Sequence, residues 1–290
     1  MPSFLWYCSL AATGVAATII TMCIKRREYK ISTLLVFYVF AACLTWIGEF
    51  TVLGIFNSYA YMPGVFSDPW AENLTGHLLL NTTMWPAAAL VAAAGRPAYG
   101  WYPLFLAYFI FPEYLFLRLG IYEQHWWRYP MSAVLVVVFL TIVRRWLPKI
   151  SGAVRPTPRT TVLYFVCFFI IHFPIPLLLL TGRQYYSLDW VNALAGNLYR
   201  SSTIFVFSYQ LIEAFIITIF VCVLKKWYWK AAAFVVAFAG QIILAGLHIL
   251  SFRNGWGLPQ DILVHVLCLA AFMLIERHTL KRRAADTVRR

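Results

Sequence analysis

The sequence predicts an all-α bundle of about nine membrane-spanning helices. Of its 290 residues, 62% are apolar or aromatic and only 12% are charged, and the mean hydropathy is +0.72. An ordinary soluble domain has about 25% charged residues, so this chain has too little charge to cover a surface in contact with water. Its apolar stretches are continuous, which favours helices over the alternating strands of a membrane barrel.

Nine apolar segments are long enough, or nearly so, to cross a bilayer, which takes about 20 residues of helix. They run over residues 4–24, 32–56, 75–95, 99–119, 130–147, 160–181, 202–224, 231–251 and 259–276. The connections between them are short, so the sequence leaves no room for a separate soluble domain.

The net charge of +13 is distributed as expected for a membrane protein. Nearly all Lys and Arg residues follow the first, third, fifth, seventh and ninth segments. The exceptions are Arg118, Arg128, Arg183, Arg200 and Arg253. Basic residues mark the cytoplasmic side, so the N-terminus is predicted outside and the C-terminus inside. The basic loops are then expected to contact anionic lipids, and no nucleic-acid partner is predicted.

Similar residues recur at a nearly constant spacing in the first and second halves of the chain, which predicts an internal duplication. Trp101 and Glu113 align with Trp229 and Gln241 about 128 residues later, and Trp127 aligns with Trp256. The predicted organisation is a leading helix (1–28), a four-helix repeat (29–150), a linker (151–159), a second four-helix repeat (160–280) and a basic cytoplasmic tail (281–290). Four helices per repeat make the repeats parallel. A functional site between the halves and a fused dimer with one decayed half both remain open.

Ionisable groups inside membrane segments are costly, so they are the candidate site residues. Three glutamates are candidate acid–base residues: Glu49, Glu113 and Glu213. The candidate substrate-binding residues are His77, Asn81, Arg118, Trp127, Gln241 and His248. His77 and Asn81 are four residues apart and therefore share one helix face. These groups suggest a polar cavity open toward the outer half of the membrane; the alternative is that they are hydrogen-bonded packing residues.

No pattern in the sequence predicts a metal or another cofactor. The six cysteines all fall within apolar segments, and no pair has the CxxC spacing. The HExxH, P-loop, GxGxxG and GxSxG patterns are absent.

A set of short motifs resembles an uncharacterised family of small multipass membrane proteins, mainly from spore-forming Gram-positive bacteria. The motifs are Met84-Trp85-Pro86, Glu113, Leu119-Gly120-Ile121, Trp127, Arg144-Arg145 and, in the second half, Asn254-Gly255-Trp256. Gln241 departs from the pattern, because the family has a Glu there. The resemblance implies two tandem copies over about residues 30–280 in a bacterial plasma membrane. It implies no chemistry.

A second resemblance is to membrane-embedded lycopene-type cyclases. The segment Trp46-Ile47-Gly48-Glu49, followed by Tyr61-Met62-Pro63-Gly64, is similar to their Trp-acid and Pro-Gly pattern. Phe111-Pro112-Glu113 is similar to the start of their Pro-x-Glu-Glu motif, although the second acid is missing. This resemblance implies that a protonated carboxyl acts as a general acid on an isoprenoid, with aromatic rings stabilising a cation.

Three functions therefore remain open. The chain acts on a lipophilic, isoprenoid-like substrate, or it is a proton-coupled transporter that uses the same carboxylates, or it binds a lipid or protein partner without catalysis. Membrane lipids and a lipophilic small molecule are the expected partners.

Overall fold

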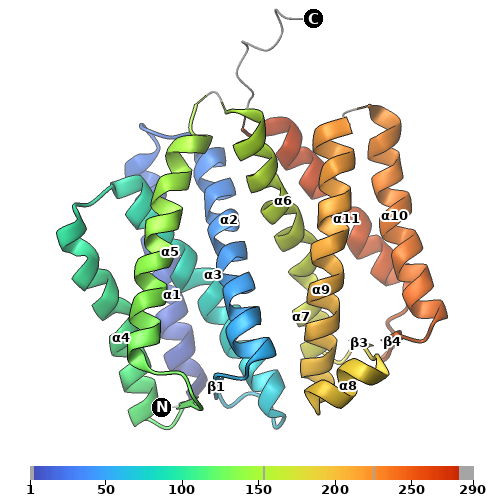
Figure 1. Ribbon diagram of the computed structural model, residues 1–290, viewed down its shortest axis with the longest axis horizontal. Helices are drawn as coiled ribbons and strands as arrows, with labels where there is room; N and C mark the ends of the chain where they lie inside the picture. The colour runs from blue at the N-terminus through green and yellow to red at the C-terminus, as the bar shows by residue number, and fades with distance from the viewer. Residues whose placement is uncertain (1–2, 153, 225, 281–290) are drawn as a thin grey trace, which may run out of the picture. The chain divides into compact units, whose positions relative to one another are not determined.

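The computed structural model describes residues 3–152, 154–224 and 226–280, and the predicted basic tail therefore lies outside the described residues (Figure 1). Eight helical stretches in the described part are long and apolar enough to span a membrane. They support a multipass membrane protein. The predicted segment 99–119 contains a shorter helix, so the count of nine and the orientation stay predictions. The described residues divide into two compact units, unit 1 up to residue 155 and unit 2 from residue 156 to residue 280.

Unit 1 contains helices that surround one pair of short strands. Its elements are α1 (Ser3–Lys25), α2 (Ile31–Glu49), the π-helical turn η1 (Phe50–Ile55), β1 (Tyr59–Tyr61), α3 (Pro69–Gly95), the 3-10 turn η2 (Tyr99–Trp101), α4 (Tyr102–Arg118), β2 (Tyr122–Gln124) and α5 (Tyr129–Ile150). β1 and β2 are antiparallel, with Tyr59 opposite Gln124 and Tyr61 opposite Tyr122. The start of α1 and strand β1 lie at the same end of the unit (Figure 1).

Helix α3 is the centre of unit 1, because α1, α2 and α5 all pack against it. Asp68 caps its start: the side chain accepts hydrogen bonds from the backbone N–H groups of Trp70 and Ala71 at 2.8 and 3.1 Å. Gly14 of α1 brings the two helices close together, since a Cβ at that position would lie 2.8 Å from the backbone nitrogen of Met84. Small residues at helix contacts are a common way to pack membrane helices.

Unit 2 also contains helices around a pair of strands. Its elements are α6 (Pro156–His172), α7 (Pro174–Leu180), β3 (Gln184–Tyr186), α8 (Asp189–Ala195), α9 (Leu198–Thr218), the π-helical turn η3 (Ile219–Leu224), α10 (Trp227–Gly246), β4 (Leu250–Phe252) and α11 (Leu258–His278). β3 and β4 are antiparallel, with Gln184 opposite Phe252. The predicted segment 160–181 is interrupted at Phe173, just before Pro174 and close to Pro176.

From α2 onward, unit 1 has the same order of main elements as unit 2: a long helix, a strand, a long helix, a returning helix, a second strand and a long helix. Unit 1 has α1 in addition, and unit 2 has the short helices α7 and α8. The first strand is also tied to the following long helix in the same way. The Tyr61 backbone N–H donates to Asn73 Oδ1 at 2.6 Å, and the Tyr186 backbone N–H donates to Ser202 Oγ at 2.9 Å. None of these strands was predicted from the sequence, because three residues are too few to show an alternating pattern.

Candidate functional site

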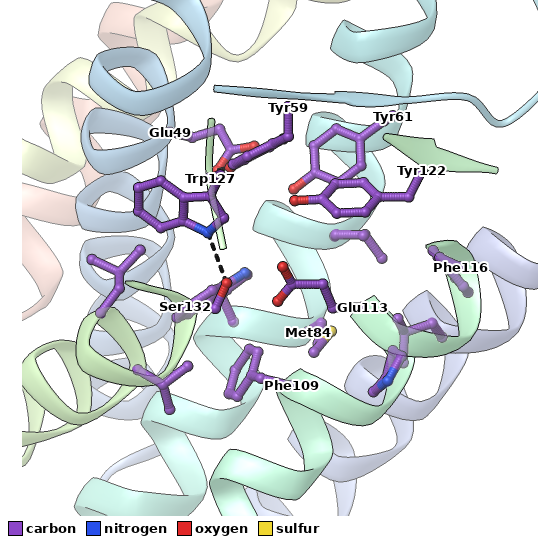
Figure 2. Close-up of a pocket in the computed structure, with 16 residues that line it drawn as sticks. Glu49, Tyr59, Tyr61, Met84, Phe109, Glu113, Phe116, Tyr122, Trp127 and Ser132 are labelled. Carbon is purple, nitrogen blue, oxygen red and sulfur yellow. Dashed lines mark hydrogen bonds between the residues drawn. The ribbon is translucent and has the colours of Figure 1, made fainter. Parts of the chain in front are cut away.

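Unit 1 contains a cavity of about 90 Å³ between α1, α3, α4, α5 and the two strands (Figure 2). We call it the carboxylate chamber. It is lined by Leu10, Glu49, Tyr59, Tyr61, Leu80, Met84, Trp85, Phe109, Pro112, Glu113, Phe116, Tyr122, Trp127, Ser132, Leu135 and Val136. A single water needs roughly 10–15 Å³ of such space, so the chamber accommodates a small polar group or several waters.

Glu49 reaches the chamber from the last residue of α2. The Tyr59 hydroxyl donates a hydrogen bond to Glu49 Oε2 at 2.6 Å. The other carboxyl oxygen, Oε1, is buried and has no hydrogen-bond partner among the described residues. The side chains of Tyr61 and Asn81 lie near this carboxyl. Glu49 is therefore held in the chamber by the Tyr59 hydroxyl, with Tyr61 and Asn81 close to its carboxyl.

Glu113 enters the same chamber from α4. Gln124 Nε2 donates a hydrogen bond to Glu113 Oε1 at 2.7 Å. Ser132 lies beside Glu113, and its hydroxyl accepts a hydrogen bond from Trp127 Nε1 at 2.7 Å. Figure 2 shows the Glu113 carboxyl pointing into the space between Ser132 and the tyrosines. Two carboxyl groups from helices far apart in the sequence thus line one cavity.

Aromatic rings form one wall of the chamber. The Tyr59 ring centroid lies 5.4 Å from Tyr61, 5.3 Å from Tyr122 and 6.0 Å from Trp127. Burial, together with the nearby Glu49 charge, raises the pKa of the Tyr59, Tyr61 and Tyr122 hydroxyls well above the usual value. The hydroxyls therefore stay protonated at neutral pH and act as hydrogen-bond donors. Tyr7 of α1 secures the strands, since its hydroxyl donates to the Ile121 carbonyl at 2.6 Å.

An apolar groove lies next to the chamber, along α1, α3 and α4. The groove has a volume of about 610 Å³. It is lined by Thr13, Ala17, Ala87, Ala88, Val91, Pro97, Trp101, Leu104, Phe105 and Tyr108. These residues follow the chamber residues of α1 and α3 by about one helical turn and precede those of α4 by about one turn. Between the two spaces, the Thr13 and Tyr108 hydroxyls are hydrogen-bonded at 3.0 Å, and the Trp85 and Phe109 rings pack in a tilted arrangement with their centroids 4.2 Å apart.

The structure brings together three of the predicted site residues: Glu49, Glu113 and Trp127 all line the chamber. His77 and Asn81 share one face of α3, as expected, and their side chains are hydrogen-bonded to each other at 3.2 Å. Neither lines the chamber; Asn81 lies near the Glu49 carboxyl, and the His77 ring packs on Trp46 at 4.9 Å.

The remaining predicted site residues lie elsewhere. Arg118 is exposed in the last turn of α4 and donates to the Tyr114 hydroxyl at 3.2 Å, and the described residues show no ion pair between it and Glu113. Glu213 and Gln241 belong to unit 2, on α9 and α10, and are buried there. His248 was expected inside a helix; α10 ends at Gly246, and His248 is exposed in the turn before β4.

Sequence reasoning missed the tyrosines that surround Glu49. Tyr59 and Tyr61 sit in a short connection between apolar segments, where isolated aromatic residues suggest only a membrane interface. The alternation of Tyr59 and Tyr61, which places both side chains on one strand face, was the available signal.

No protein-family model, curated protein or solved structure matches the chain. The described residues contain no group of three or more His, Cys, Asp or Glu side chains arranged to hold a metal ion.

Proposed function

We propose that unit 1 binds an amphiphilic, isoprenoid-like molecule and performs acid–base chemistry on it. The observation that carries the proposal is the presence of Glu49 and Glu113 in one aromatic chamber, with an apolar groove about one helical turn away along α1, α3 and α4. The polar or unsaturated end of the substrate occupies the chamber, and its hydrocarbon tail lies along the groove.

The charge of the chamber limits the chemistry of the occupant. Its lining includes two carboxyl groups, three phenol hydroxyls and one serine hydroxyl, but no Lys or Arg. A phosphate group would meet repulsion there without a counter-charge. The chamber therefore favours a hydrocarbon, an alcohol or an amine over a phospholipid headgroup.

The two carboxyls supply both halves of a proton transfer. A protonated carboxyl donates its proton to a double bond of the substrate, forming a carbocation, and the ionised carboxyl removes a proton from a neighbouring carbon. The substrate is isomerised or cyclised, and no net proton is consumed. The rings of Tyr59, Tyr122 and Trp127 present electron-rich faces that stabilise the cation, and general acid–base catalysis of this kind contributes about 10²–10⁴-fold to a rate.

The test compares lipid extracts and co-purified lipids from cells that produce the wild type, Glu49→Gln or Glu113→Gln, analysed by mass spectrometry. Glu123→Gln is the matched control, because Glu123 lies on β2 but is exposed and outside the chamber. We expect a new lipid product with the wild type and the control, and a loss of at least 100-fold with either chamber variant.

Two outcomes would separate binding from catalysis. If the same lipid co-purifies with all four proteins and no product forms, unit 1 is a lipid-binding module and the catalytic proposal is wrong. If product yield is unchanged in Glu113→Gln, the assignment of the carboxyls is wrong. Transport by the same carboxylates would instead appear as pH-dependent flux in proteoliposomes.

We also propose that the two units are copies of one ancestral four-helix unit in a bacterial plasma membrane, with the N-terminus outside and the C-terminus inside. Their common order of elements and the basic residues after alternate segments support this arrangement. Reporter fusions that are active on only one side of the membrane, placed at each terminus, test the orientation. A periplasmic C-terminus would contradict it.

A further inference from the structure

We propose that the ligand of the unit 1 groove is an isoprenoid phosphate ester whose anionic head lies beside Arg96 and Arg144. The inference rests on the proposed function, which supplies the isoprenoid chain, and it names the polar end of that chain. The groove is lined at one end by Pro97 and Trp101, which belong to the connection between α3 and α4. Arg96 begins this connection, and Arg144 of α5 packs against it.

Two contacts hold the Arg144 side chain over the connection. Its guanidinium carbon lies 4.7 Å from the centroid of the Tyr99 ring, and Nη2 donates a hydrogen bond to the Arg96 carbonyl at 3.5 Å. The other terminal nitrogen, Nη1, is buried and has no hydrogen-bond partner among the described residues. A buried donor without a partner is costly, and phosphate oxygens are acceptors that match a guanidinium group.

The positive charge at this end of unit 1 is largely uncompensated. Neither Arg96 nor Arg144 forms an ion pair within the described part of the chain. The ends of α1 and α5 lie at the same end of the unit as the connection (Figure 1). The basic residues there are Lys25, Arg26, Arg27, Arg96, Arg144, Arg145 and Lys149. Glu28, the acid that follows α1, is paired with Lys25 at 2.6 Å. This end of the groove therefore attracts an anion.

The carboxylate chamber has the opposite preference. Its lining contains Glu49 and Glu113 but no Lys or Arg, so it repels a phosphate. Met84 of the chamber and Arg96 are twelve residues apart along α3, which corresponds to about 18 Å of helix. The two ends thus fix the direction of an amphiphile: the phosphate lies by the arginines, and the far end of the chain points toward the chamber.

This direction also limits the reaction. The double bond that accepts a proton is the one remote from the phosphate, and the proton is returned from a neighbouring carbon as in the proposed function. The phosphate ester bond is neither formed nor broken, so the product keeps its anionic head.

Arg145 separates a specific site from general attraction to a charged surface. Basic residues beside a membrane attract anionic lipids without any built site. Arg145 is adjacent to Arg144 and carries the same charge, but it is exposed and forms no hydrogen bond or ion pair among the described residues. Loss of either arginine removes one charge from the same end of unit 1. Only loss of Arg144 removes the guanidinium held over the connection.

The test measures equilibrium binding to the full-length protein in phosphatidylcholine nanodiscs. The probes are radiolabelled geranylgeranyl diphosphate and radiolabelled geranylgeraniol, and empty nanodiscs correct for partition into the bilayer. We expect the wild type to bind the diphosphate about tenfold more tightly than the alcohol or better. Arg144→Gln should lose this preference, and the control Arg145→Gln should keep it within about twofold.

Several results would overturn the proposal. Equal affinity of the wild type for the two probes, or equal losses in Arg144→Gln and Arg145→Gln, would reject the phosphate site and leave the proposed function standing. Binding of neither probe would reject both. Displacement of the diphosphate by an equal concentration of phosphatidylglycerol would mean that any anionic lipid is accepted, which also rejects the assignment.

The wild type alone decides if Arg144→Gln does not fold. At 1 M NaCl the screening length falls to about 3 Å, so the preference for the diphosphate over the alcohol should shrink markedly. A preference unchanged by salt would overturn the proposal.

Discussion

Gly76→Ala is the sharpest test of how the chamber is built. Gly76 is buried on α3 directly behind Tyr61, and a Cβ at this position would lie 2.4 Å from Tyr61 Cβ and 2.6 Å from its Cγ. Ordinary contact begins at about 3.4 Å, so one side must move by about 1 Å. Tyr61 cannot escape by rotating its ring, because its Cβ is fixed to the β1 backbone, which Asn73 holds through a 2.6 Å hydrogen bond.

Overpacking of a buried site costs about 1–3 kcal/mol. For a unit of this size, each kcal/mol of lost stability lowers Tm by about 2–4 °C. The control is Gly48→Ala in α2, where the added methyl group meets nothing within 4 Å. Ala is up to about 1 kcal/mol more favourable than Gly in a helix, so this control should be neutral or stabilising.

The assay is thermal unfolding in detergent, combined with the lipid extraction that tests the proposed function. We expect Gly76→Ala to lower Tm and to reduce lipid binding, since displacement of β1 moves Tyr59 and Tyr61 together. A Gly76→Ala protein as stable as Gly48→Ala would refute the packing of Tyr61 against α3. Lower stability with unchanged lipid binding would mean that β1 does not shape the chamber.

Three further substitutions test single contacts. Tyr59→Phe leaves Glu49 without its hydroxyl donor and should cost about 1–3 kcal/mol in denaturant unfolding; an unchanged midpoint would contradict the contact. The Glu72 carboxylate accepts hydrogen bonds from the backbone N–H groups of residues 64–66. Glu72→Gln should therefore speed the hydrogen exchange of these three amides and leave exchange in β3 unchanged; unchanged exchange at residues 64–66 would contradict the contact. Arg159→Ala should destabilise unit 2 by about 1–3 kcal/mol, because Glu276 loses its 2.9 Å partner and keeps only Lys230 at 3.6 Å, and Arg159→Lys should recover part of the loss.

The membrane class and most helix positions follow from the sequence alone. Each of the eight long apolar helices overlaps one predicted segment, because a bilayer requires about 20 apolar residues whatever the fold. The candidate acids could also be identified from the sequence, since burying a carboxyl in an apolar segment costs free energy and therefore indicates a specific role. His77 and Asn81 could be paired because helical spacing by itself places them on one face.

The convergence of side chains was decided by the tertiary structure. Glu49 and Glu113 meet in one chamber only because β1 pairs with β2 and carries the ends of α2 and α4 to the same place. Hydropathy determines which segments enter the membrane, one segment at a time. Which faces of those segments meet depends on packing between residues far apart in the chain, and a single sequence does not encode that packing in any local pattern.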